Sequence, residues 1–168
     1  MVRSVEDILV CGNPISGMGR GISIAQGVTE FAQRAGIHAR MHLEHPSQLP
    51  ADWIPAERGV VVAVGGDGTL RGVVDRLLRH ADAGGALPRV VTIPLGTANL
   101  VATHLGCKWK GNRIAADVLR AIHSGCERKF DIATANGRAM LAVGGVGFDA
   151  QVVHELASRR RGPITYSG

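Results

Sequence analysis

The feature that most constrains the fold is a repeated order of apolar run, glycine-rich turn and amphipathic segment. The clearest apolar run is Gly59 to Val64, in which valine and alanine follow one another without the alternation of a half-exposed strand. A strand with two apolar faces is typical of a parallel sheet that helices cover on both sides. The order strand, loop, helix repeats up to about residue 125. The sequence therefore predicts an α/β fold with an open, doubly wound and mostly parallel sheet.

The spacing of apolar residues predicts where the individual elements lie. We expect strands at residues 7–11, 37–43, 59–64 and 90–93, and helices at residues 16–35, 69–83, 98–105 and 113–124, the last capped by Asn112. Alternation in the second strand places His38 and His42 on one solvent face, which does not favour a metal site. After residue 125, residues 129–135 and 138–143 indicate two strands joined by Asn136-Gly137, a strong hairpin signal.

This change of pattern predicts a domain boundary. We expect residues 1–126 to form the α/β domain, and residues 127–168 to begin a β-rich second domain that is incomplete in this chain. A helix is expected from Ala150 to Arg160. The sheet edges and apolar faces of an incomplete domain would lie uncovered, so we expect self-association, for example as a homodimer.

Three loops at the carboxyl ends of predicted strands form the candidate site. They span residues 12–17, 65–69 and 94–99. Ligands bind at this edge of open α/β sheets. Glycines let the backbone approach a phosphate, and the first N–H groups of the following helix point towards it. Ser16, Thr69 and Thr97 add hydroxyl donors, whereas none of the loops has the Gly-Lys-Ser/Thr ending of a Walker A loop.

Asp67 is the most informative residue of these loops. It stands between glycines directly after the third strand, close to the core, where an unpaired carboxylate would cost several kcal/mol. A magnesium ion with its waters would compensate this charge. A cap on the following helix is the alternative explanation.

The loops resemble, in order and spacing, the catalytic domain of diacylglycerol kinase-like lipid kinases, a family that includes soluble bacterial lipid kinases and the sphingosine and ceramide kinases. The matching segments are Asn-Pro-x-Ser-Gly at 13–17, Gly-Gly-Asp-Gly-Thr at 65–69, Pro-Leu-Gly-Thr-x-Asn at 94–99 and Gly-Phe-Asp-Ala at 147–150. The resemblance covers roughly residues 8–155. The third segment favours the lipid branch over the related NAD kinases and phosphofructokinases, which share a GGDG-type loop.

The resemblance implies that ATP and Mg²⁺ bind across the loops and that the γ-phosphoryl group passes to the hydroxyl of a diacylglycerol-like lipid. It makes Asp67 and Asp131 the candidate catalytic residues, with Asp67 at the metal. The cofactor-binding residues that it implies are Asn13, Pro14, Ser16, Gly17, Gly65, Gly66, Asp67, Gly68, Thr69, Gly96, Thr97 and Asn99. Phosphoryl transfer requires positioning and charge neutralisation more than covalent help, which suits such donor-rich loops.

Two departures from the family pattern keep alternatives open. Leu100 stands where many members carry an acidic residue. The glutamate that looks like the family's general base lies near the C-terminus of its members and has no match here; Glu155 lies in a predicted helix and is not a substitute. A non-catalytic ATP-binding module and an NAD kinase-like nucleotide kinase are therefore the alternative functions.

The net charge and the cysteine content limit the kinds of partner and the cellular compartment that we expect. The net charge of +5 favours anionic partners, and Arg159 to Arg161 suit acidic lipid or a solvated helix end. Trp53 and Trp109 are isolated and offer no stacking ladder for nucleic acid. Three cysteines without a CxxC pair favour a reduced, cytoplasmic protein, with at most peripheral membrane contact because no apolar run reaches the ~20 residues of a membrane span.

Overall fold

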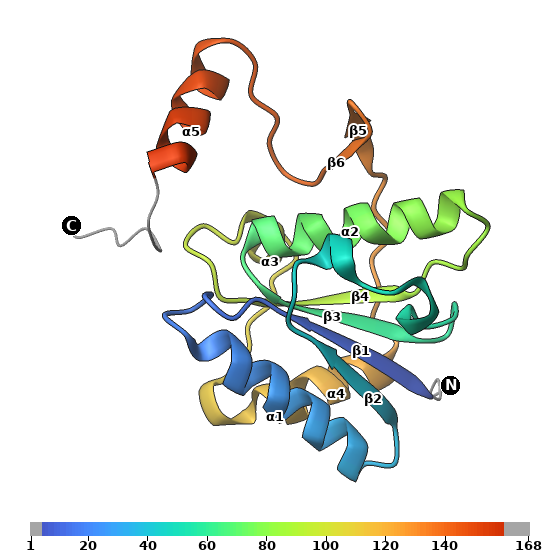
Figure 1. Cartoon of the computed structure of the whole chain (residues 1–168). Helices are drawn as coiled ribbons and strands as arrows, with labels where there is room; N and C mark the ends of the chain where they lie inside the picture. The colour runs from blue at the N-terminus through green and yellow to red at the C-terminus, as the bar shows by residue number, and fades with distance from the viewer. Residues whose placement is uncertain (1–4, 160–168) are drawn as a thin grey trace.

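The computed structural model describes residues 5–159 and centres on a four-stranded parallel sheet (Figure 1). The strands are β1 (Asp7–Gly12), β2 (His38–His42), β3 (Val60–Gly65) and β4 (Arg89–Pro94), and their order is β2-β1-β3-β4. In the register of the sheet, Val10 of β1 lies between Met41 of β2 and Val62 of β3. The predicted α/β fold with a parallel sheet is confirmed.

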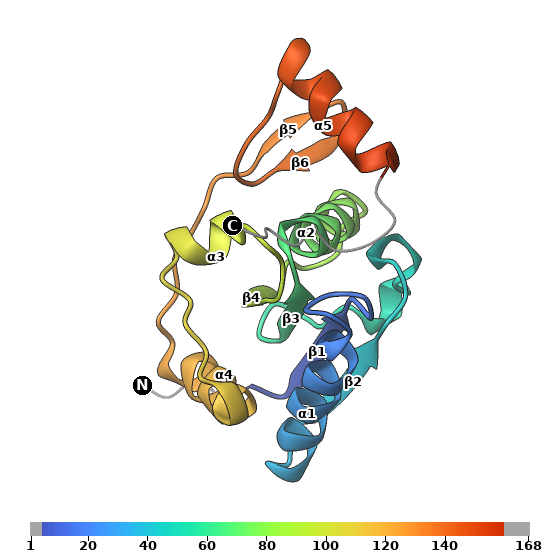
Figure 2. The same ribbon diagram turned by 90° about the vertical axis from the view of Figure 1, so that its left-hand side faces the viewer.

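Helices cover both faces of the sheet (Figure 2). The helices α1 (Arg20–Arg34) and α4 (Ile114–Ser124) lie on one face, and α2 (Asp67–Asp82) and α3 (Leu100–His104) lie on the other. Alternate residues of each inner strand point to different cores: Val62 belongs to the cluster around α1 and α4, and Val61 to the cluster around α2. The inner strands are apolar on both faces because both faces are buried.

Several predicted helix starts differ from the structure. The helix expected from residue 16 begins at Arg20, because Gly17, Met18 and Gly19 have φ of 59°, 57° and 86°, outside the helical range. Ser16 therefore lies in a turn and not at a helix start. Asn112 does not cap α4; it belongs to a short 3₁₀ turn (Gly111–Arg113), and Arg113 precedes the helix. The second predicted helix starts two residues earlier than expected, so that Asp67 is its first residue.

The prediction that His42 lies on a solvent face is also wrong. His42 pairs in register with Cys11, and only 6% of its surface is exposed. The segment after β2 folds back over this face in two 3₁₀ turns, Pro46–Gln48 and Ala51–Trp53, and carries Leu49 into the α2-side core. One face of an edge strand such as β2 is exposed only if the following chain leaves it uncovered, and here the following chain covers it.

A small antiparallel sheet follows the α/β layers. Strands β5 (Ala133–Ala135) and β6 (Arg138–Met140) pair through the turn Asn136-Gly137, whose φ angles are 51° and 69°. The predicted hairpin is confirmed, although each strand has three residues and is shorter than expected. Helix α5 (Phe148–Arg159) follows. The boundary at residue 126 and the larger β-rich domain stay predictions, and Arg160 and Arg161 lie outside the described residues.

Within residues 5–159, none of the helices combines the length and the apolar character that a bilayer span requires.

Candidate active site

The three glycine-rich loops meet at the carboxyl edge of the sheet (Figure 1). Loop 1 follows β1 (residues 12–19), loop 2 follows β3 (residues 65–69) and loop 3 follows β4 (residues 94–99). Strands β1 and β3 are neighbours, yet the chain visits the edge strand β2 between them. Loops 1 and 2 therefore flank the topological switch point, where ligands bind in open α/β sheets.

Asn13 joins loop 1 to loop 2. Its side-chain Nδ2 donates to Oγ1 of Thr69 at 3.2 Å, and its backbone N donates to the carbonyl oxygen of Val64 at 3.0 Å. Its Oδ1 accepts from the N–H of Ile15 at 3.1 Å. The side chain that we predicted to contact the nucleotide thus holds two loops in a fixed relation.

Loops 2 and 3 approach each other closely at two glycines. A Cβ atom on Gly96 would lie 2.6 Å from Cα of Gly66, which is closer than side chains approach in proteins. The N–H of Leu95 donates to the carbonyl oxygen of Gly65 at 2.9 Å. Within loop 3, Asn99 has a φ of 48°, its Oδ1 accepts from the N–H of Gly96 and its Nδ2 donates to the carbonyl oxygen of Gly96. Glycine at 96 is therefore a packing requirement, and a Cβ atom on Gly66 would also be tight, at 3.1 Å from Cα of Gly96.

The carboxylate of Asp67 binds the start of α3. Its Oδ2 accepts from the N–H of Leu100 at 3.0 Å, and its Oδ1 accepts from the N–H of Val101 at 3.4 Å. Asp67 thus caps α3, a helix 33 residues further on, rather than the helix in which it stands.

Asp67 remains compatible with a hydrated magnesium ion. Each carboxylate oxygen has a second lone pair, and Mg²⁺ in kinases keeps several waters and binds one or two carboxylates together with substrate phosphates. Among residues 5–159, no three His, Cys, Asp or Glu side chains gather as a metal site. A metal here would therefore depend on ligand phosphates for the rest of its coordination.

Asp131 lies beside α3, at the entrance to the β5–β6 hairpin. The ring of its neighbour Phe130 packs edge-on against the ring of His104, the last residue of α3, with 6.2 Å between ring centroids. This contact holds the chain at residues 130–131 next to the helix that Asp67 caps. The catalytic role of the exposed Asp131 stays a prediction.

Loop 1 also contacts loop 3 and carries a cation that the sequence analysis missed. A Cβ atom on Gly17 would lie 3.3 Å from Cβ of Leu95. Arg20, the first residue of α1, folds back so that its Nε donates to the carbonyl oxygen of Gly17 at 3.1 Å. The expected helix start at residue 16 concealed this arginine, and the order glycine, any residue, glycine, arginine at 17–20 was the signal available.

The remaining candidates are distributed over the same loops. Pro14 and Ser16 lie in the turns of loop 1, where the N–H of Ser16 donates to the carbonyl oxygen of Asn13 at 3.1 Å. Gly68 lies in the first turn of α2, and Thr97 lies in loop 3 before α3. All predicted nucleotide-contacting residues therefore come from three loops that contact one another; their contacts with a ligand stay predictions.

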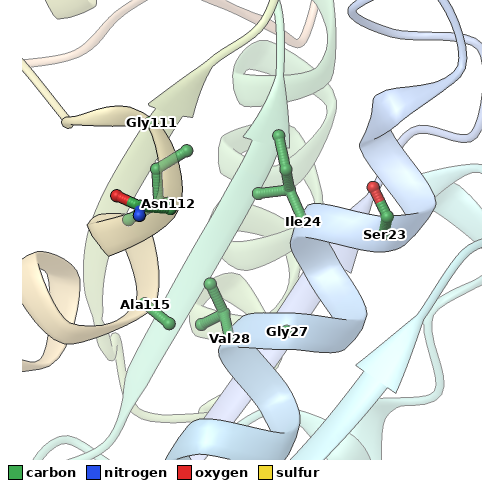
Figure 3. A pocket seen from close by; sticks show the side chains of 8 residues that line it. Ser23, Ile24, Gly27, Val28, Gly111, Asn112 and Ala115 are labelled. Atoms are coloured by element: carbon green, nitrogen blue, oxygen red, sulfur yellow. The ribbon is translucent and has the colours of Figure 1, made fainter.

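A pocket of about 170 Å³ lies between α1 and α4 and includes no residue of the three loops. Figure 3 shows Ile24 and Val28 of α1 across from Asn112 and Ala115. The site at the carboxyl edge of the sheet is thus defined by the converging backbone of the loops and is separate from this pocket.

The fold, a parallel α/β sheet with glycine-rich loops at one edge, is also that of solved structures named as diacylglycerol kinases. The family model "Diacylglycerol kinase catalytic domain" matches residues 7–135. The chain belongs to the diacylglycerol kinase catalytic-domain family.

Relatives carry both lipid kinase and NAD kinase names. An "NAD kinase" of Nitratidesulfovibrio vulgaris is 32% identical over 135 residues, which cover 76% of this chain and 41% of that protein. A "Probable lipid kinase YegS-like" of Stenotrophomonas maltophilia is 49% identical over 47 residues, or 28% of this chain and 15% of that protein. A crystal structure of a diacylglycerol kinase from Bacillus anthracis str. Sterne has the same fold, with a TM-score of 0.58 and 21% identity over 81% of this chain and 48% of that chain. The chain thus spans less than half the length of these relatives.

Proposed function

We propose that the three loops bind the phosphates of ATP with Mg²⁺ and that the protein transfers the γ-phosphoryl group to a lipid hydroxyl. The observation that carries this proposal is the contrast between Gly68 and the other glycines of the loops. The packing of loop 2 against loop 3 restricts Gly66 and Gly96, because an added Cβ atom would lie 3.1 Å and 2.6 Å, respectively, from Cα of the other glycine. Gly68 is exposed, its φ is not left-handed, and apart from its chain neighbours and the adjacent backbone of its own helix no atom lies within 4 Å of the position of a Cβ atom.

Folding therefore gives no reason for glycine at position 68. Glycine in a helix costs up to about 1 kcal/mol relative to alanine. Glycine at position 68 is explained if a ligand approaches the backbone of loop 2 closely. An anionic ligand suits this place, because the N-terminus of the 16-residue helix α2 attracts negative charge and presents free N–H groups. Arg20 adds a positive charge beside loop 1. These features suit a polyphosphate better than a neutral ligand.

The first experiment compares two glycine-to-alanine variants. Gly68→Ala adds a methyl group where the phosphates are proposed to lie, and we expect its affinity for ATP with Mg²⁺, measured by isothermal titration calorimetry, to fall at least about tenfold. Gly27→Ala is the matched control, since Gly27 also lies in a helix with no atom within 4 Å of a Cβ position, but on α1 beside the separate pocket. Equal ATP affinity of the two variants would contradict the proposal.

Replacement of Asp67 is a less specific test. Because its carboxylate caps α3, Asp67→Ala would disturb loop 3 even in the absence of a metal. Gly68→Ala removes no hydrogen bond, so a loss of affinity in this variant reports on the ligand.

The phosphoryl acceptor is the second part of the proposal. A lipid acceptor is supported by membership of the diacylglycerol kinase catalytic-domain family and by the relative with a lipid kinase name. Transfer of radiolabelled phosphate from ATP to diacylglycerol, monoacylglycerol or sphingosine tests it in the intact protein. Such an acceptor implies peripheral contact with a membrane surface, to which the net charge of +5 is suited.

An NAD kinase-like activity is the second candidate, because the relative named NAD kinase aligns over 135 residues of this chain. The same assay with NAD as acceptor distinguishes the two: labelled NADP without a labelled lipid would replace the lipid proposal. Binding of ATP without transfer to any acceptor would identify a non-catalytic nucleotide-binding module, the outcome that Leu100 favours.

A further inference from the structure

Asp75, in the middle of α2, contacts the β5–β6 hairpin. Its Oδ1 accepts from the backbone N–H of Ala139 in β6 at 2.6 Å, across 64 residues of sequence. A hydrogen bond with a charged partner contributes more than one between neutral groups. Figures 1 and 2 both show the hairpin along the outer side of α2.

The N–H of Ala139 belongs to the free edge of β6. In the ladder, Ala139 is opposite Thr134, while its N–H is directed to the helix. Unpaired N–H groups at a sheet edge invite pairing with another strand. Because the carboxylate of Asp75 accepts a hydrogen bond from this N–H, α2 takes the place that a neighbouring strand would have at this edge.

Apolar contacts support the same placement. Ala139 is only 3% exposed, although most of the hairpin around it is open to solvent. Leu141 packs against the core cluster that contains Leu70 and Val73 of α2. The hairpin is therefore held on α2 by one buried alanine, one leucine and the hydrogen bond that the N–H of Ala139 donates to Asp75.

The position of this contact links the hairpin to the candidate site. Helix α2 begins with Asp67, and Asp75 lies eight residues later, roughly 12 Å along the helix axis. The chain that enters the hairpin is held at its other end by Phe130 against His104 of α3. Residues 130–139 are thus attached to the two helices that follow loops 2 and 3.

We propose that Asp75 is a positioning residue: it fixes the β5–β6 hairpin on α2 and thereby sets the position of Asp131 relative to loops 2 and 3. The hydrogen bond of Asp75 runs to the hairpin, and Asp75 acts on the site through it. The consequence for catalysis rests on the proposed kinase function, whereas the attachment of the hairpin does not.

The test uses Asp75→Ala, Asp75→Asn and the control Asp82→Asn in the intact protein. Asparagine at 75 keeps an oxygen acceptor, and Asp82 is an exposed acidic residue at the end of the same helix. In Asp75→Ala we expect amide hydrogen exchange of Ala139 to accelerate at least about tenfold, with a smaller change in Asp75→Asn and none in Asp82→Asn. We also expect Asp75→Ala to lower kcat for phosphoryl transfer while the Kd for ATP with Mg²⁺ stays within about twofold, because the loops are untouched.

These measurements distinguish a positioning role of Asp75 from a general effect of Asp75 on the stability of the fold. Unchanged exchange at Ala139, faster exchange with an unchanged kcat, or a loss of ATP affinity equal to the loss of kcat would overturn the proposal. If the wild-type protein transfers no phosphate, the proposed function fails, and the exchange of Ala139 alone decides whether Asp75 holds the hairpin.

Discussion

At the scale of single residues, position in the fold decides what a polar or reactive group can do. Asn13, Asp67 and Asn99 look like ligand-binding residues in the sequence, yet their side chains make hydrogen bonds that fix the loops. Pre-organised loops lower the cost of ordering on binding, so a residue can serve a phosphate site without contacting the phosphate.

Cys11 provides a prediction at this scale. Burial at the end of β1 raises the pKa of its thiol from 9.0 to about 12, so the folded state keeps the neutral thiol where the unfolded chain ionises. The contribution of the neutral Cys11 thiol to the free energy of unfolding is fully present below pH 9. It is lost as the pH rises towards 12, and the free energy of unfolding then falls by roughly 1.4 kcal/mol per pH unit. Urea unfolding between pH 8 and 10.5 should show a shallower decline for Cys11→Ala than for the wild type. Cys126→Ala, at an exposed cysteine, should retain the wild-type decline, and identical slopes in all three proteins would contradict this account.

At the scale of elements, the short helix α3 depends on a residue outside it. It has five residues, too few for a helix that is stable by itself. Its first two N–H groups bind Asp67, and its last residue supports Phe130. The helix therefore exists because loop 2 and the entrance to the hairpin hold both of its ends.

Removal of this cap should destabilise the protein. We expect Asp67→Ala to lower the free energy of unfolding by about 1 kcal/mol, the usual effect of losing a helix cap. Asp82→Ala, which removes an exposed acid from the other end of α2, should change it by less than about 0.5 kcal/mol. Chemical denaturation of the two variants measures the difference, and equal stabilities would show that the Asp67 cap does not stabilise the fold.

At the scale of the whole molecule, several apolar side chains after the hairpin are exposed. Val143, Val146 and Phe148 are 78%, 93% and 79% exposed, whereas the two faces of the parallel sheet are closed by helices. Exposed apolar groups favour association, and self-association of these 168 residues stays a prediction.

Size-exclusion chromatography with light scattering tests this expectation. The 168-residue chain should elute above its monomer mass of 17.6 kDa, and the double variant Val146→Ser/Phe148→Ser should shift towards the monomer. Leu87→Ser, which replaces an exposed leucine away from this region, should leave the association unchanged. A monomeric wild-type chain would contradict the expectation.

The sequence by itself determined the local elements and their order. Apolar runs and, for the second strand, alternation predicted the parallel strands. Glycine-rich segments predicted the loops at their carboxyl ends, and Asn136-Gly137 predicted the hairpin, because each depends on residues that are close in the chain. The family motifs placed the candidate residues on these loops, and the family match confirms the resemblance.

Only the tertiary structure decided which partners these residues take. Asp67 binds α3 across 33 residues, Asn13 binds Thr69 across 56, and Asp75 binds Ala139 across 64. His42 is buried because a later segment folds back over its strand, and α1 starts late because loop 1 takes left-handed backbone angles beside loop 3. Such contacts depend on the order of strands in the sheet and on the packing of helices against it, which no local pattern of residues encodes.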